Sequence, residues 1–213
     1  MSGKYNIIRR GRLRPPSCFT PLKRDDGAAI QAQSTGRRFD PSLILGTAAR
    51  CPFGLPSVIA CAPLRAGEPF PTTFWLTCPH LVKLCGSLES GGAVTELDGL
   101  AAGDEGRWTR YHLLHAQIRL LLTPRSRARH FRKHRRPLWD ALRKGGVGGA
   151  GYSSVLRRGA KCLHLHGASW LALGFHPAGE FFEKNLAPLS CEAPPPVCAP
   201  YVKKRKEIFH VEG

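Results

Sequence analysis

The sequence predicts a small α+β protein in which a short antiparallel sheet or hairpin is packed by several helices, with disordered basic tails at both ends. Three strand-like segments between residues 42 and 77 precede a series of helix-like segments that ends near residue 186. A chain of 213 residues suits one core of ordinary size. We therefore expect a disordered tail over residues 1–40, one domain over residues 41–187 and a proline-rich, basic tail over residues 188–213.

The predicted strands cover residues 42–50, 57–61 and 72–77. Their β-branched and aromatic side chains are typical of sheets. Between the first two strands, residues 51–56 read Cys-Pro-Phe-Gly-Leu-Pro, and this proline and glycine content predicts a turn. The order of strand, turn and strand favours an antiparallel arrangement.

The helices begin after the last strand. Cys78 stands where an N-cap belongs, Pro79 suits the first helical turn, and Gly91 and Gly92 end the pattern. Further helices are predicted over residues 106–123, 137–144 and 162–173, with a shorter one after Pro177. Residues 145–151 contain five glycines and predict a flexible loop, which is either a mobile linker or a cradle for a phosphate.

Composition indicates the class of partner. A formal charge of +17 favours anionic partners such as nucleic acid, phosphorylated ligands or an acidic membrane surface. There is neither a signal-peptide pattern nor an apolar stretch long enough to span a membrane, so we expect a cytoplasmic protein. In a reducing compartment, its eight cysteines are better interpreted as ligands, nucleophiles or small hydrophobic residues than as disulfides.

Thiols and imidazoles at the ends of predicted elements indicate a metal site for zinc or iron, because both metals accept these donors. Cys162 shares a helix face with His166, or shares a side with His164 if the chain is still extended there. Cys78 is expected to lie near Cys162. The candidate ligands are Cys51, Cys78, Cys162 and His164, with His166 and Cys191 as substitutes.

Two other functions compete with metal binding. In a thiol-dependent enzyme, Cys78 would be the nucleophile, activated by the helix N-terminus, and His80 or His164 would be the base. In a nucleic-acid-associated protein, a basic run would bind polyanions weakly, and Phe131 would stack on a base. The cations of that run are Arg125, Arg127, Arg129, Arg132, Lys133, Arg135 and Arg136. A solvated basic surface with no ligand explains the same run.

Four sequence motifs carry a family resemblance. They are Arg-Cys-Pro-Phe-Gly-Leu-Pro at residues 50–56, Pro-Phe-Pro-Thr at 69–72, Trp-Leu-Thr-Cys-Pro at 75–79 and Lys-Cys-Leu-His at 161–164. In this combination the chain resembles the bacterial family labelled domain of unknown function 501, over about residues 41–186. The resemblance implies no established activity. It also implies that His can replace Cys78, an exchange that a metal ligand tolerates and a nucleophile does not.

Overall fold

The computed structural model describes residues 8–9, 12–13, 18–150 and 160–202. The C-terminal basic run at residues 203–206 and Gly151 therefore lie outside the described residues, as does most of residues 1–17. The predicted α+β class is confirmed: small antiparallel sheets are packed with helices. No helix in the described part of the chain is long and apolar enough to cross a membrane.

The central sheet has three antiparallel strands in the order β3 (Ile44–Arg50), β4 (Pro56–Cys61) and β7 (Phe74–Leu76). These strands match the three predicted segments to within a few residues. Short hairpins are formed by β1 (Ile8–Arg9) with β2 (Arg12–Leu13), and by β5 (Leu64–Arg65) with β6 (Glu68–Pro69). Because β4 lies between two neighbours and is buried at every position, both faces of the sheet must be covered.

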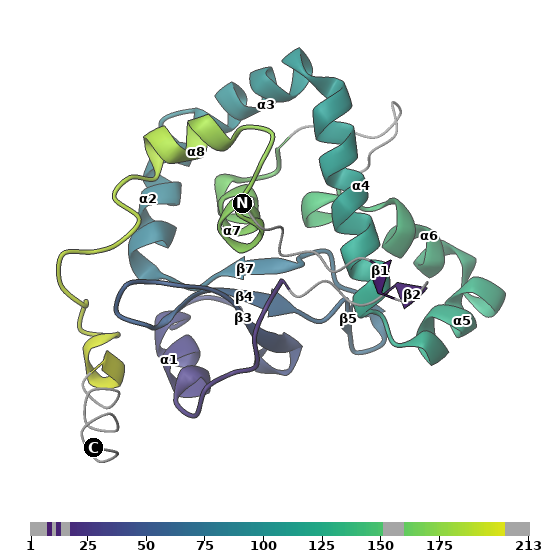
Figure 1. Ribbon diagram of the computed structural model, residues 1–213, viewed down its shortest axis with the longest axis horizontal. Coiled ribbons are helices and arrows are strands. Elements are labelled where there is room, and N and C mark those ends of the chain that lie inside the picture. The colour runs from purple at the N-terminus through teal and green to yellow at the C-terminus, as the bar shows by residue number, and fades with distance from the viewer. Residues whose placement is uncertain (1–7, 10–11, 14–17, 151–159, 203–213) are drawn as a thin grey trace.

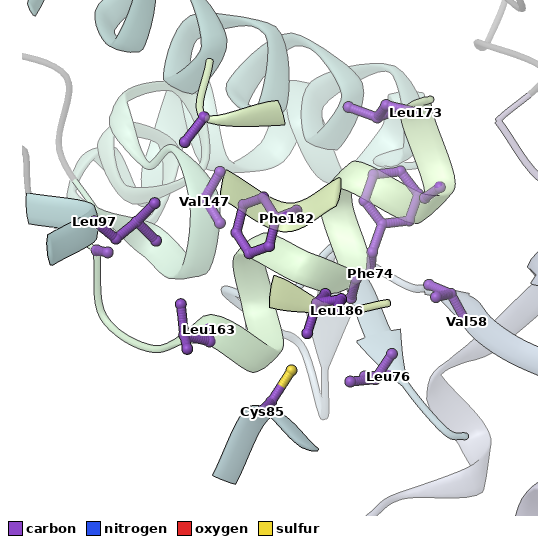
Figure 2. Packing of buried hydrophobic residues seen from close by; sticks show 14 of the residues in the cluster. Val58, Phe74, Leu76, Cys85, Leu97, Val147, Leu163, Leu173, Phe182 and Leu186 are labelled. Atoms are coloured by element: carbon purple, nitrogen blue, oxygen red, sulfur yellow. The ribbon is translucent and has the colours of Figure 1, made fainter. Parts of the chain in front are cut away.

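The two faces of β4 belong to separate cores. Val58 and Ala60 belong to the larger core, which includes α7 (Leu163–Leu173), whereas Ile59 and Cys61 pack with Ile30 of α1 (Asp26–Gln33). This alternation follows the two-residue period of a strand. Figure 1 shows α7 and α1 on opposite sides of the sheet. Figure 2 shows the larger core, where Phe182 of α8 (Gly179–Asn185) and Leu186, which follows that helix, lie over α7.

The other helices lie around the larger core and at one end of the molecule (Figure 1). They are α2 (Pro79–Ser90), α3 (Ala93–Gly103), α4 (Glu105–Leu122), α5 (Arg125–His134) and α6 (Arg136–Lys144), with 3-10 turns at Pro41–Leu43 and Val147–Gly149. Helix α2 begins at Pro79 after the N-cap Cys78, as predicted. The sequence did not predict α1 and α3, and it did not identify the basic run as the helix α5.

Residues 18–40 differ from the expected disordered tail. Helix α1 buries Ile30 completely, and the fully buried carboxylate of Asp26 pairs with Arg50 of β3. The pair is bidentate: Arg50 Nη2 lies 2.6 Å from Asp26 Oδ2, and Arg50 Nη1 lies 3.0 Å from Asp26 Oδ1. Thr47 and the backbone amide of Lys23 also donate to this carboxylate. The segment is therefore anchored by an ion pair that its composition does not reveal.

The expected C-terminal tail is also packed in part. Cys198 is buried against Ala29 of α1 and Leu55, and His80 contacts the Pro188 carbonyl through Nε2 at 2.9 Å. Residues 188–202 thus lie along the α1 and α2 side of the molecule (Figure 1).

We predict that Asp26→Asn lowers the free energy of unfolding by about 3–5 kcal/mol, because it leaves a largely buried guanidinium without its charged partner. Urea denaturation followed by circular dichroism measures the change. Asp25→Asn, a neighbouring substitution with the same loss of charge, is the control and should change stability by less than about 0.5 kcal/mol. Equal effects of the two substitutions would contradict a role for the buried pair.

Candidate functional site

Helix α7 brings the Cys-His motif together. Its N-cap, Cys162, has extended backbone angles (φ −166°, ψ 155°), and the helix begins at Leu163. The extended residue places the Cys162 thiol near His164, as in the second of the two predicted arrangements. His166 is buried one turn further on and contacts other residues.

A carboxylate from another helix completes the group. Donor atoms of Glu89, Cys162 and His164 all lie within 4.8 Å of one another. Glu89 stands in the last turn of α2. Its Oε1 accepts hydrogen bonds from the amide of Leu163 at 2.6 Å and from the amide of His164 at 3.4 Å. Glu89 therefore caps the N-terminus of α7, where the helix dipole favours a negative charge.

The two ring nitrogens of His164 define the chemistry of the group. Nε2 lies 3.1 Å from the carbonyl oxygen of Val82, which accepts hydrogen bonds only, so Nε2 carries a proton. Nδ1 lies 3.0 Å from Glu89 Oε1, which also accepts when ionised. Two lone pairs cannot face each other without a positive charge between them. Either a proton lies between Nδ1 and Oε1, on one atom or the other, or a metal ion lies beside both atoms.

The pKa of the Cys162 thiol determines whether metal binding would release a proton. Burial raises the pKa of its thiol, and the charge of Glu89 raises it further, against lowering by the amides of Leu165 and His164 and by Lys161. Without a cation, the thiol is therefore protonated at neutral pH. A metal ion binds the thiolate, so occupation of this group would release a proton.

The other predicted ligands lie elsewhere. Cys51, Cys78 and Cys191, together with Cys198, line a cavity of about 10 Å³, close to the volume of one water molecule. Cys78 and Glu89 lie at opposite ends of α2, which separates them by roughly 16 Å along the helix axis. The expected meeting of Cys78 with Cys162 is therefore not found. In the part of the chain that the structure describes, only Glu89, Cys162 and His164 form a group of this kind.

Cys78 does not have the properties of a nucleophile. Burial raises the pKa of its thiol to about 11, and this outweighs the lowering by the amides of Leu81 and His80. The expectation that the helix N-terminus would favour a thiolate is thus wrong, because the side chain is 6% exposed. Of the two proposed bases, His80 contacts the Pro188 carbonyl and His164 belongs to the group at the other end of α2.

His166 belongs to a buried histidine cluster formed by α4, α7 and the segment before α8. The cluster consists of His112, His115, His166 and His176, each at most 2% exposed. Ala178 donates its amide to His176 Nδ1 at 3.0 Å, so His176 Nε2 carries the proton and donates to His166 Nδ1 at 2.9 Å. His112 Nδ1 similarly accepts the amide of Val147 at 3.1 Å. His166 and His176 therefore satisfy each other and the backbone as neutral groups.

A second buried network lies beside this cluster. Ser169 of α7 contacts the hydroxyl of Tyr111, and its Oγ lies 2.6 Å from His115 Nε2. Ser169 is fully buried, so this serine and histidine pair cannot reach a substrate and instead joins α4 to α7. Its signal in the sequence is the spacing of Tyr111, His112 and His115 along the helix predicted over residues 106–123.

Glu89 is the member of the group that sequence reasoning missed. A signal was nevertheless present: an acidic residue in the last turn of a helix is disfavoured by the helix dipole and needs another partner. The partner is the start of α7, distant in sequence.

The fold and this group define a small α+β protein with a candidate Glu/Cys/His metal centre. A family model described as "Protein of unknown function (DUF501)" matches residues 47–184, and the chain belongs to this family. The resemblance stated from the motifs is thereby confirmed. No curated protein and no solved structure matches the chain.

We predict that the buried histidines make the fold sensitive to acid. Burial lowers the pKa of His166 to about 3 and holds the pKa values of His115 and His176 well below their usual range. Below about pH 6.5 the unfolded chain therefore binds protons that the folded chain does not, and stability is lost as the pH falls. The free energy of unfolding should decrease by up to about 1.4 kcal/mol per pH unit for each histidine.

Urea denaturation between about pH 7 and about pH 5 tests this slope. His166→Gln removes one titrating group and should reduce the slope, whereas His134→Gln, an exposed substitution on α5, should leave it unchanged. A slope that is the same in all three proteins would contradict the prediction.

Proposed function

We propose that this protein binds a divalent transition metal ion, with zinc as the best match, through Glu89, Cys162 and His164. The observation that carries the proposal is the pair of contacts made by His164. The Val82 carbonyl fixes the proton on Nε2, which directs the lone pair of Nδ1 toward Glu89 and Cys162. A hydrogen bond from the remote nitrogen to a backbone carbonyl is the usual support of a metal-bound histidine.

The donor set favours zinc over harder ions. Thiolate, imidazole and carboxylate together suit zinc, and ferrous iron accepts the same atoms, whereas magnesium and calcium prefer oxygen alone. Both Glu89 and His164 have a quarter of their side-chain surface exposed, so solvent can reach the group. Three protein ligands and a water molecule would complete a tetrahedral shell, the pattern of zinc sites that keep one exchangeable position.

A purely structural role explains part of the geometry. Glu89 caps α7 whether or not a metal is bound, and an imidazolium at His164 would complete a salt bridge. That alternative requires no thiol. The presence of Cys162 within the same group of donors favours the metal.

We predict that the reduced, chelator-treated protein binds one equivalent of Zn²⁺, and that Cys162→Ser and His164→Gln each weaken this binding at least about 100-fold. Competition with a chromophoric chelator measures the affinity. Titration with Co²⁺ should produce a thiolate-to-cobalt charge-transfer band that Cys162→Ser abolishes.

Two controls locate the ion. His130→Gln on α5 removes an exposed imidazole and should leave Zn²⁺ binding unchanged. Cys191→Ser alters the cavity lined by four cysteines and should also leave it unchanged. If Cys191→Ser abolishes binding while Cys162→Ser does not, the metal lies among the cysteines and the proposed group is wrong.

Polyanion binding through α5 and the start of α6 is a second candidate function. All seven cations of the basic run are exposed. Among the described residues, ion pairs engage only two of them, Arg135 with Glu68 and Arg136 with Asp140. Phe131 is buried and anchors α5 to the core, so the expected stacking of its ring on a base is corrected. Backbone phosphates are then the natural partners, without base readout.

We predict that duplex DNA or heparin retains the protein at low salt and releases it at moderate salt, because each neutralised phosphate releases a counterion. Combined replacement of Arg132, Lys133, Arg135 and Arg136 by glutamine should abolish retention without changing the circular dichroism spectrum. Retention that persists after this change would place binding elsewhere in the chain.

A further inference from the structure

A cleft lies between the glycine loop and the short hairpin β5–β6. Its volume is about 440 Å³, within the range of small-molecule sites. Its wall combines residues 69–71, Arg119 of α4, the C-terminal end of α6, Gly148, Gly149 and Lys161. Three segments noted in the sequence thus meet in this cleft: the Pro-Phe-Pro motif, the glycine run and the lysine before Cys162. The proposed metal group does not use this cleft.

Arg119 is the unusual group in this wall. It is 2% exposed, and its guanidinium donates to the carbonyls of Gly145, Gly146 and Pro71. Its Nε finds no acceptor among the described residues, and no carboxylate there pairs with it. Burial lowers its pKa only to about 10, so the group is charged at neutral pH. A buried cation without an anion is costly, and an anionic ligand would compensate for it.

Most of the other charged side chains that line the cleft are also positive. Lys161 donates to the Gly148 carbonyl at 2.8 Å, and Lys144 stands at the end of α6. The one carboxylate in the wall, Asp140, is already held by Arg143 at 2.7 Å and by Lys144 at 3.3 Å. Arg119 and Lys161 therefore face the cleft without a carboxylate partner among the described residues, beside Lys144, which pairs with Asp140.

The described part of the glycine loop packs against the core. Gly148 and Gly149 have positive φ values of 59° and 78°. A Cβ atom at Gly148 would lie 2.5 Å from Leu165 Cδ1 of α7, and one at Gly146 would lie 2.3 Å from His112 Nδ1. This packing holds the loop against the core, so the cleft is formed before any ligand arrives.

We propose that this cleft binds a small molecule carrying a phosphomonoester group. The phosphate lies against Arg119 and Lys161, which supply charge and hydrogen-bond donors. Phe70, also in the wall, offers an apolar surface for the remainder of the ligand. A sugar phosphate and a nucleotide share this chemistry, and they differ in whether a base can pack on Phe70.

Isothermal titration calorimetry of the full chain tests the proposal, with chelator present so that the metal group plays no part. The probes are inorganic phosphate, ribose 5-phosphate and adenosine 5′-monophosphate. We expect ribose 5-phosphate to bind with one site per chain, and Lys161→Gln and Lys144→Gln each to weaken it at least about tenfold. Lys83→Gln, an exposed substitution on α2 with the same loss of charge, should leave the affinity unchanged.

Further arms identify the ligand class and the outcomes that overturn the proposal. Tighter binding of adenosine 5′-monophosphate than of ribose 5-phosphate, with the difference lost in Phe70→Leu, would indicate a nucleotide, and equal affinities a sugar phosphate. Absence of heat with every probe, or equal weakening by Lys83→Gln, would overturn the proposal. So would binding that survives Lys161→Gln and is lost when the four α5 and α6 cations are replaced.

Discussion

The fold depends on the burial of a helix that carries polar side chains. Helix α7 packs against the sheet on one side and against α2, α4 and α8 on the others, yet its sequence includes His164, His166 and Ser169. A buried polar group without a partner costs free energy, so each of these side chains requires a specific neighbour. The surrounding elements supply them: Glu89 from α2, His176 from the segment before α8, and His115 from α4.

The need of each polar side chain of α7 for a partner also decides where the potential metal ligands lie. The partners at the start of α7 lie near solvent and form a group of three donors, whereas those further along are sealed in the core. Histidines of the same helix therefore have different roles, depending on how deeply each is buried in the core. His164 retains access to ions, while His166 is held neutral by burial. The residue preceding Cys162, Lys161, faces the cleft, so both proposed ligands would meet the protein at the same end of one helix.

Features that depend on residues close together in the sequence could be predicted from it. The three strands, the start of α2 at Pro79 and the pairing of Cys162 with His164 follow from periodicity, capping and the extended N-cap. Contacts between distant segments were not predictable in this way. Glu89 meets His164 across 75 positions, and α1 is held by Asp26 and Arg50, 24 positions apart. Cys51 and Cys78 instead lie with Cys191 and Cys198 of the last described segment, and the sequence did not separate this group from Cys162 and His164.

Because both faces of β4 are buried, the chain can be truncated only at positions that leave both faces covered. The family match spans residues 47–184, but the face of the sheet that carries Ile59 and Cys61 is covered by α1 and by Leu43, which precede it. A fragment cut at those limits would present that apolar face to water, with the guanidinium of Arg50 deprived of Asp26. Such a surface promotes self-association. The segment matched by the family model therefore leaves out residues that cover one face of the sheet.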